Sequence, residues 1–205
     1  MHKLILDELP EEFVRHLQPS FEDLPHTAHK DGAFRLRRYS VAGAYGDKLE
    51  NTEFTQSSDF NKYQGDATRK FDPIEDHVFF SEGFTHAVNL FRNIADLHHE
   101  EVEAHQMRIS THEKAVPVSP EGVHQDGFDA VGIFSINRVN VLGGEALLFS
   151  DKVGYPFFSQ SLEPGVFVII DDRELWHSAK AIVPVNKEEP AHMDAFILTG
   201  RRDSV

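Results

Sequence analysis

Short strand-like runs, separated by turn residues, fill the second half of the chain and limit its possible folds more than any other feature. The runs are rich in β-branched and aromatic residues, and they cover residues 102–110, 128–138, 145–149, 166–170, 176–183 and 194–200. Glycine and proline stand between them, as at Gly143, Gly144 and Pro164. Many short strands joined by turns predict an antiparallel sandwich or barrel of the jelly-roll kind.

Helical patterns occur in the first half of the chain. Residues 9–17 contain a proline and two glutamates near their start and stop before Pro19, which predicts a short amphipathic helix. Residues 83–101 carry apolar side chains at helical spacing, with His98 on the same face, and predict a core-facing helix. Helices followed by strands argue against a parallel α/β sheet. We therefore expect a mainly β chain with flanking helices.

An alternating segment at residues 34–41 predicts a further strand. Its alternation places Arg35, Arg37 and Tyr39 on one face and Arg38 on the other. Three arginines within four residues suit either an anion site or a set of ion pairs. In a chain with many carboxylates, we expect surface pairs with nearby Asp and Glu.

The chain length of 205 residues predicts a single domain, 1–205. Residues 46–73 are polar and rich in turn residues, so we expect a long loop with brief strand pieces, and such loops are often lids or binding loops. Residues 1–101 would then supply the N-terminal helices, strands and candidate lid. Residues 102–200 would form the β core.

The charge balance limits the possible partners. Asp and Glu number 34 against 20 Lys and Arg, a formal net charge of −14. A field of this sign repels phosphate backbones and anionic lipids, so neither nucleic acid nor a membrane is expected as a partner. The chain has no cysteine, which excludes thiolate chemistry and disulfides. Without a signal-like or membrane-length apolar segment, we expect a cytoplasmic location. No pattern indicates an oligomeric state.

Three residues at the start of two predicted strands suggest a metal site. His124 and Asp126 are two positions apart, so on an extended strand their side chains face the same way. His177 follows in a later strand. Two imidazoles and one carboxylate on one face of a metal, with the opposite positions open, form the facial triad of non-haem Fe(II) oxygenases. This ligand set favours Fe(II) over Zn(II).

Gln106 and Arg108 share one face of their predicted strand and could line the same cavity. Burying an arginine is costly unless it meets a carboxylate. A bound organic acid would satisfy Arg108, and so would one of the protein's own carboxylates. Spacing alone leaves both alternatives open.

The motif around the candidate metal ligands resembles a known family. Pro120-Glu121-Gly122-Val123-His124-Gln125-Asp126-Gly127-Phe128-Asp129 is followed by Asn137-Arg138, Asn140 and Gly143-Gly144-Glu145. This pattern is similar to the bacterial free amino acid hydroxylases that depend on Fe(II) and 2-oxoglutarate (2OG), of which the L-isoleucine 4-hydroxylases are familiar members. The similarity covers about residues 100–200, and the N-terminal half is only loosely similar.

The resemblance implies a double-stranded β-helix, the jelly-roll core shared with cupins, with helices packed on one side. It implies that His124, Asp126 and His177 hold Fe(II), with no catalytic residue beyond these ligands. The protein would then use 2OG and O2 to hydroxylate a small molecule, most plausibly a free L-amino acid, with succinate and CO2 as co-products.

Four further residues receive expected roles within this resemblance. Arg138 and Thr199 would contact 2OG, the co-substrate. Gln106 and Arg108 would contact a carboxylate of the substrate.

One departure from the family pattern concerns 2OG. The family carries an arginine near the start of the last core strand, where it binds the distal carboxylate of 2OG, and Met193 stands at that position here. Arg201 is eight residues further on, more than about 25 Å along a strand, and is too far to replace it. Arg138, Arg108 or His192 could substitute, although alternation places His192 on the opposite face. Met193 favours a first rival hypothesis, a non-catalytic metal-binding barrel that binds or senses a ligand. A second rival is a metal-dependent enzyme on the same scaffold that does not use 2OG.

Overall fold

The computed structural model describes residues 3–202, and its largest element is a seven-stranded antiparallel sheet. In spatial order this major sheet contains β1 (Leu4–Glu8), β11 (Val166–Asp171), β7 (Ala130–Val139), β14 (Ala191–Gly200), β6 (Val102–Thr111), β2 (Arg35–Ala42) and β3 (Lys48–Leu49). Three of these strands come from the N-terminal half of the chain. Four of the predicted core strands, β6, β7, β11 and β14, therefore share one sheet with β1, β2 and β3.

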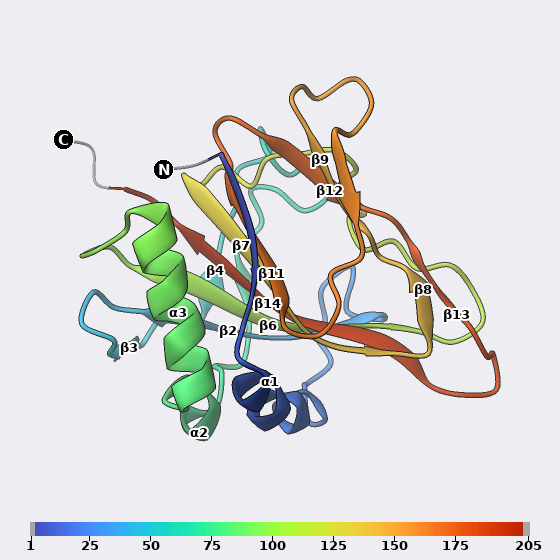
Figure 1. The fold of residues 1–205 in the computed structure, drawn as a ribbon, viewed down its shortest axis with the longest axis horizontal. Helices are drawn as coiled ribbons and strands as arrows, with labels where there is room; N and C mark the ends of the chain where they lie inside the picture. Colours follow the sequence, from blue (N-terminus) through green and yellow to red (C-terminus); the bar gives the residue numbers. More distant parts are fainter. Residues whose placement is uncertain (1–2, 203–205) are drawn as a thin grey trace.

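A second layer of short strands faces the major sheet. It consists of β10 (Phe158–Gln160), β9 (Ala146–Phe149) and β12 (Trp176–Ala179), with the pair β8 (Val141–Gly143) and β13 (Ile182–Pro184) beside them. Figure 1 shows β9, β12, β8 and β13 on one side of the major sheet. Two facing antiparallel layers form the jelly-roll architecture, and the predicted fold class is confirmed.

The helices cover the other side of the major sheet (Figure 1). They are α1 (Glu11–Leu17), the 3-10 turn η1 (Gln18–Phe21), α2 (Asp76–Phe79) and α3 (Glu82–Ala95). Alternate side chains of the central strands pack into two different clusters. Phe134 and Phe196 point towards Phe91 of α3 within one buried cluster. The alternate positions on the same strands, such as Ile133 and Ile197, point towards the second layer. The major sheet thus separates a helix-covered core from the space between the two layers.

The second predicted helix ends earlier than expected. Asp96 adopts a left-handed conformation (φ 60°), and the N–H of Leu97 donates back to the carbonyl of Arg92, which closes the helix after Ala95. Leu97 is fully buried, whereas His98 is exposed. The predicted helix was therefore too long, because the chain reverses before His98.

The predicted strand at 176–183 is two strands in two different pairs. β12 pairs with β9, and β13 pairs with β8 after a break at residues 180–181. The tight turn at Gly143 lies beside this break. A Cβ at Gly143, which has φ 84°, would lie 2.1 Å from the carbonyl oxygen of Ala181, so only glycine fits there.

A β-bulge changes the orientation of one end of β7. Along the pairing with β14, Ser135 faces Ala195 but Asn137 faces Asp194, so Ile136 is an extra residue on β7. Before the bulge, the odd-numbered side chains of β7 face the second layer. After it, the parity is reversed and Arg138 pairs with Met193. The bulge therefore places Arg138 on the inner side of the sheet.

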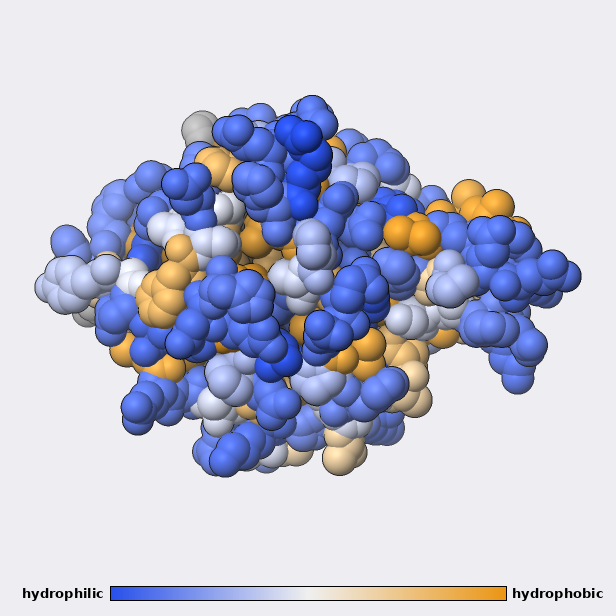
Figure 2. Space-filling model, turned by 90° about the horizontal axis from the view of Figure 1, so that it is seen from below, coloured by the Kyte–Doolittle hydropathy of each residue, from blue (hydrophilic) through white to orange (hydrophobic). Residues whose placement is uncertain are grey.

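The molecular surface is mostly hydrophilic on the face shown in Figure 2, where hydrophobic residues form small separate groups. Within residues 3–202, no helix combines the length and apolar character needed to cross a membrane.

Candidate metal centre

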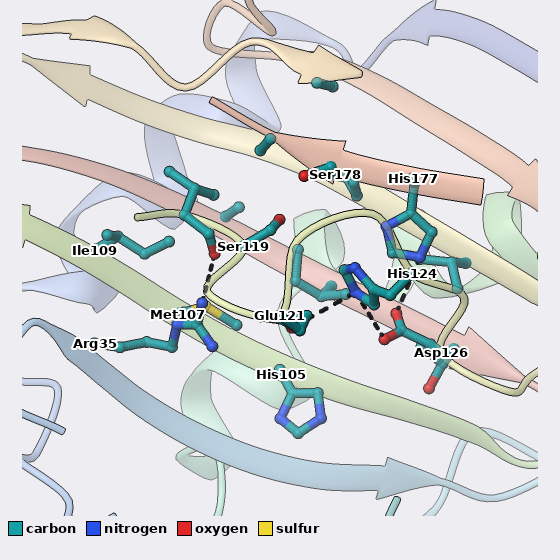
Figure 3. A pocket seen from close by; sticks show the side chains of 18 of the residues that line it. Arg35, His105, Met107, Ile109, Ser119, Glu121, His124, Asp126, His177 and Ser178 are labelled. Carbon is teal, nitrogen blue, oxygen red and sulfur yellow. Dashed lines mark hydrogen bonds and ion pairs between the residues drawn. The ribbon is translucent and has the colours of Figure 1, made fainter. Parts of the chain in front are cut away.

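The three residues predicted to bind a metal meet at one end of the space between the layers. Nε2 of His124 lies 3.4 Å from Oδ1 of Asp126, and Nε2 of His177 lies 3.5 Å from Oδ2 of the same carboxylate. One ligand atom from each residue lies within 4.8 Å of the others. Ligands at right angles with bonds of about 2.1 Å lie about 3 Å apart. The three side chains, which point towards one another in Figure 3, therefore surround a space suited to one ion.

The backbone fixes the two histidines relative to each other. The N–H of His124 donates to the carbonyl of His177 (2.9 Å), and the N–H of His177 donates to that of His124 (2.8 Å). This isolated antiparallel bridge joins the segment before β7 to β12. The ring centroids consequently lie only 4.3 Å apart.

Asp172 connects the two ligand-bearing segments through its side chain. Its Oδ2 accepts hydrogen bonds from the backbone N–H groups of Asp126, Gly127 and Phe128, at 2.8, 2.8 and 3.2 Å. Its Oδ1 lies 3.2 Å from Nε2 of His177. Asp172 is 1% exposed. The sequence predicts no role for Asp172, because a contact across 46 residues leaves no local signal.

The electrostatics of the site favour an ionised carboxylate beside a cation. Burial alone would raise the pKa of Asp126, but the hydrogen bond from His124 and the charges of both histidines lower it well below its usual range. Burial lowers the pKa of His124, yet Asp126 and Glu121 outweigh it and raise that pKa to about 9. Nε2 of His177 is buried and neither donates nor accepts a hydrogen bond. An orphaned imidazole nitrogen facing a carboxylate fits a divalent cation.

A cavity of about 160 Å³ extends from the triad between the two layers. The major sheet contributes mostly apolar side chains to it, including Val131, Ile133 and Ile197. Met193 and Thr199 from β14 also line the cavity. The hydroxyl of Thr199 is buried and makes no hydrogen bond. The structure thus brings Thr199, one of the two residues expected to contact 2OG, to the same cavity as the triad.

Gln106 and Arg108 lie on the opposite face of β6, away from the cavity. Arg108 forms a two-pronged ion pair with Asp194, at 2.7 and 2.9 Å, and also contacts Glu22. The side-chain amide of Gln106 donates to the carbonyl and hydroxyl oxygens of Ser20. The expectation that they line the metal-containing cavity is therefore corrected. The protein's own carboxylates satisfy Arg108, and the neighbouring odd-numbered residues of β6 face the cavity instead.

Arg138 lies behind the end of the cavity that is formed by Gly144 and Met193. One of its Nη atoms donates to the carbonyl of Gly143 (2.7 Å), and the other is buried without a partner. A Cβ added to Gly144 would lie 3.1 Å from Sδ of Met193 and 3.3 Å from Nη1 of Arg138. The hydroxyl of Ser135, which lines the cavity, is also buried without a hydrogen bond. Two unpartnered donors therefore lie near Met193.

Arg35 and Arg37 are buried, which corrects the expectation of surface ion pairs. Both pair with Asp31, at 2.9 and 3.4 Å, and both line the cavity. Arg38, on the other face of β2, does form the expected pair, with Glu75 at 2.9 Å. The predicted alternation of the strand was correct. The face that carries Arg35 and Arg37 is the inner one, because the loop before β5 covers it.

That loop is the predicted long loop at 46–73, with brief strands β4 (Glu53–Phe54) and β5 (Arg69–Lys70). Its Gln56 donates to the backbone carbonyl and to Oδ1 of Asp126, at 3.0 and 2.9 Å. A Cβ at Gly127 (φ 83°) would lie 2.5 Å from the ring of Phe60, so the loop packs directly on the turn after Asp126. The loop covers the metal ligands, and its role as a lid stays a prediction.

Comparison with known proteins identifies the family. The family model described as 2OG-Fe dioxygenase matches residues 18–199. The chain belongs to the 2OG-Fe dioxygenase family. This 2OG-Fe dioxygenase carries a candidate iron site at His124, Asp126 and His177. Family membership implies Fe(II) and 2OG as cofactors, and O2 and a small molecule as reactants. No curated protein matches the chain.

Solved structures share the fold of this dioxygenase. A BsmA homologue from Methylobium petroleophilum PM1 is 27% identical, with a TM-score of 0.82 over 95% of this chain and 83% of that chain. IDO from Bacillus thuringiensis is 16% identical, with a TM-score of 0.80 over 98% of this chain and 95% of that one. The Fe(II)/α-ketoglutarate-dependent dioxygenase TqaL is 15% identical, with a TM-score of 0.70 over 98% and 83%. These similarities agree with a double-stranded β-helix.

Proposed function

We propose that this 2OG-Fe dioxygenase hydroxylates a free L-amino acid. The observation that carries the proposal is the triad at one end of a small cavity between the two layers of a 2OG-Fe dioxygenase. The motif at residues 120–129 resembles that of the bacterial amino acid hydroxylases, and the fold matches that of IDO, an isoleucine dioxygenase. The reaction would convert 2OG, O2 and a C–H bond into succinate, CO2 and an alcohol.

His124, Asp126 and His177 would hold the iron. Iron, when bound, supplies the redox chemistry that couples decarboxylation of 2OG to oxidation of the substrate. The chain itself sets the ligand geometry through the backbone bridge between the histidines and through Asp172. Gln56 donates hydrogen bonds to Oδ1 and to the backbone carbonyl of Asp126, which would hold this carboxylate beside the two histidines.

Arg138 would bind the distal carboxylate of 2OG in place of the arginine that Met193 replaces. Three features support this role. Arg138 is directly opposite Met193 in the sheet, one of its Nη atoms is buried without a partner, and the unpartnered hydroxyl of Ser135 lies on the same inner face. Thr199 is six residues further along β14, about 20 Å from Met193, so it would contact only the iron end of 2OG. The distal carboxylate of 2OG would satisfy the buried donors of Arg138 and Ser135.

The test is succinate formation from 2OG with Fe(II), ascorbate and O2, against a panel of free L-amino acids. We expect substrate-stimulated succinate in the wild-type protein and none in His124→Ala, which lacks one iron ligand. Addition of 2OG to the anaerobic Fe(II) protein should also produce a weak visible charge-transfer band. Stoichiometric metal binding with neither a band nor succinate would contradict 2OG dependence. Succinate formation that no amino acid stimulates would contradict the substrate class.

A further inference from the structure

Three buried arginines line the cavity on the side opposite Arg138. Arg35, Arg37 and Arg69, here called the arginine cluster, are 7%, 5% and 4% exposed. Arg35 and Arg37 come from β2, and Arg69 comes from β5 in the loop that covers the triad. Across the sheet, Arg138, Met193, Ile109 and Arg35 are register partners on four adjacent strands. At about 4.8 Å between strands, the Cα atoms of Arg138 and Arg35 are roughly 14 Å apart.

The positive charge of the arginine cluster exceeds the negative charge around it. Asp31 is the carboxylate in contact with Arg35 and Arg37. Among the described residues, no carboxylate forms an ion pair with Arg69, whose guanidinium lies over the ring of Phe54 at 4.9 Å. Glu121 and Asp126 also line the cavity and act on the cluster from a longer distance, and both lie against His124. With Asp126 assigned to the metal, three guanidinium groups face two carboxylates, which leaves one positive charge unbalanced in a buried site.

Unsatisfied donors and a perturbed pKa accompany this excess charge. Nε of Arg35 and Nε of Arg69 are buried and make no hydrogen bond. Burial, followed by the charge of Arg35, lowers the pKa of Arg37 to about 9. Buried guanidinium groups with free N–H donors facing a cavity are suited to a bound carboxylate.

The cluster and the triad lie at different places in one cavity. Figure 3 shows Arg35 at one end and His177 and Asp126 at the other, with Glu121 between them. Arg138, on the far side of Met193, lies level with Arg35 across the sheet and is already the candidate partner for the distal carboxylate of 2OG. The arginine cluster is therefore left for the second organic reactant, the substrate to be oxidised.

We propose that the arginine cluster binds an acidic group of the substrate, and that the substrate is an amino acid or related acid with one net negative charge. A zwitterion would add an ammonium group and a single carboxylate, and the surplus positive charge would remain. An acidic amino acid, with two carboxylates and one ammonium, would neutralise it, and Glu121 is placed to accept from the ammonium. This inference rests on the proposed hydroxylation and names the class of amino acid.

The test compares acids with their amide counterparts. L-glutamate, L-glutamine, L-aspartate and L-asparagine are titrated calorimetrically into the metal-free protein and into the anaerobic protein with Fe(II) and 2OG. We expect at least one acid to bind ten-fold or more tightly than its amide. Amides that bind as well as the acids would overturn the proposal.

Variants locate the binding group. Arg69→Gln breaks no ion pair within the described residues, so we expect a folded protein that has lost the ten-fold preference for the acid. Arg38→Gln is the matched control, because Arg38 lies on β2 but points away from the cavity. This variant should keep the ten-fold preference for the acid. A preference that survives Arg69→Gln and Arg35→Gln would refute the cluster as the binding group.

The 2OG band separates this inference from the proposed function. Arg69→Gln should leave the charge-transfer band of the Fe(II)–2OG protein unchanged. Loss of the band in this variant would assign the cluster to 2OG and overturn the inference. A wild-type protein without any band would contradict 2OG use. The calorimetric comparison of acids with amides in the metal-free protein would still test the arginine cluster, because it needs neither Fe(II) nor 2OG.

Discussion

Replacing Arg138 by methionine should abolish tight binding of 2OG. The Arg138 side chain is 9% exposed, and its free Nη atom is the donor that we assign to the distal carboxylate. Hydrogen bonds to charged groups contribute about 1.5–3 kcal/mol each, and removing one partner of a buried ion pair costs about 3–5 kcal/mol. At 1.4 kcal/mol per factor of ten, a loss near the lower end raises the Kd of 2OG roughly 100-fold. The assay is anaerobic titration of the charge-transfer band.

The matched variant exchanges the two side chains. Met193 is directly opposite Arg138 and lines the cavity, so Arg138→Met combined with Met193→Arg returns an arginine to the position that the family uses. We expect the double variant to recover most of the affinity that Arg138→Met loses. Arg138→Met gives up one hydrogen bond to the backbone, worth about 1 kcal/mol, and a 4.0 Å ion pair with the exposed Glu163, worth less than about 1 kcal/mol, so it should remain folded. A Kd within three-fold of wild type for Arg138→Met would refute the assignment.

Three further changes test the surroundings of the site. Asp172→Ala should weaken Fe(II) binding by about 10–100-fold in equilibrium dialysis, because it removes the acceptor of three backbone N–H groups, and an unchanged affinity would contradict its positioning role. Gln56→Ala should lower kcat while leaving the melting temperature within a few degrees, since it frees Oδ1 of Asp126, and wild-type kcat would argue against this contact. Asp31→Asn tests the pKa of the Asp31 carboxyl, which burial alone would raise but which the charges of Arg37 and Arg35 lower. The stability that Asp31 contributes should be present at pH 7 and vanish as pH falls through its lowered folded-state pKa, and an equal deficit at pH 7 and pH 3 in urea unfolding would refute it.

The triad could be predicted from the sequence because its signal is local. His124 and Asp126 are two residues apart, and an extended backbone places such side chains on one face whatever the rest of the fold does. His177 was identified by its place in a later strand and by the family resemblance. The backbone bridge between the two histidines then completes what the spacing predicts.

The faces of the central strands were less accessible. Alternation on β6 separates Gln106 and Arg108 from His105 and Met107, but it does not say which set faces inward. The answer depends on η1 and β14, which supply Ser20 and Asp194 as partners for the outer set. Arg108 was expected to need a carboxylate partner if buried, and it has one. That partner, Asp194, is 86 residues away in the sequence, so spacing could not identify it.

The position of Arg138 depends on a feature that no periodicity reveals. Strict alternation along β7 would turn its side chain towards the helices, on the same side as Phe134 and Ile136. The bulge at Ile136 inserts one residue and reverses that outcome. The proposed role of Arg138 in place of the family arginine depends on this inward orientation.

Net charge and site charge have opposite signs in this protein. The formal net charge of −14 is the basis for expecting no nucleic-acid partner, but it does not describe the cavity, where the buried Arg35, Arg37 and Arg69 outnumber the nearby carboxylates. Exposed carboxylates are screened within about 8 Å at physiological ionic strength, whereas buried guanidinium groups act on a ligand almost unscreened. Composition therefore bears on macromolecular partners, whereas the proposal that the cavity binds acids rests on the placement of individual side chains.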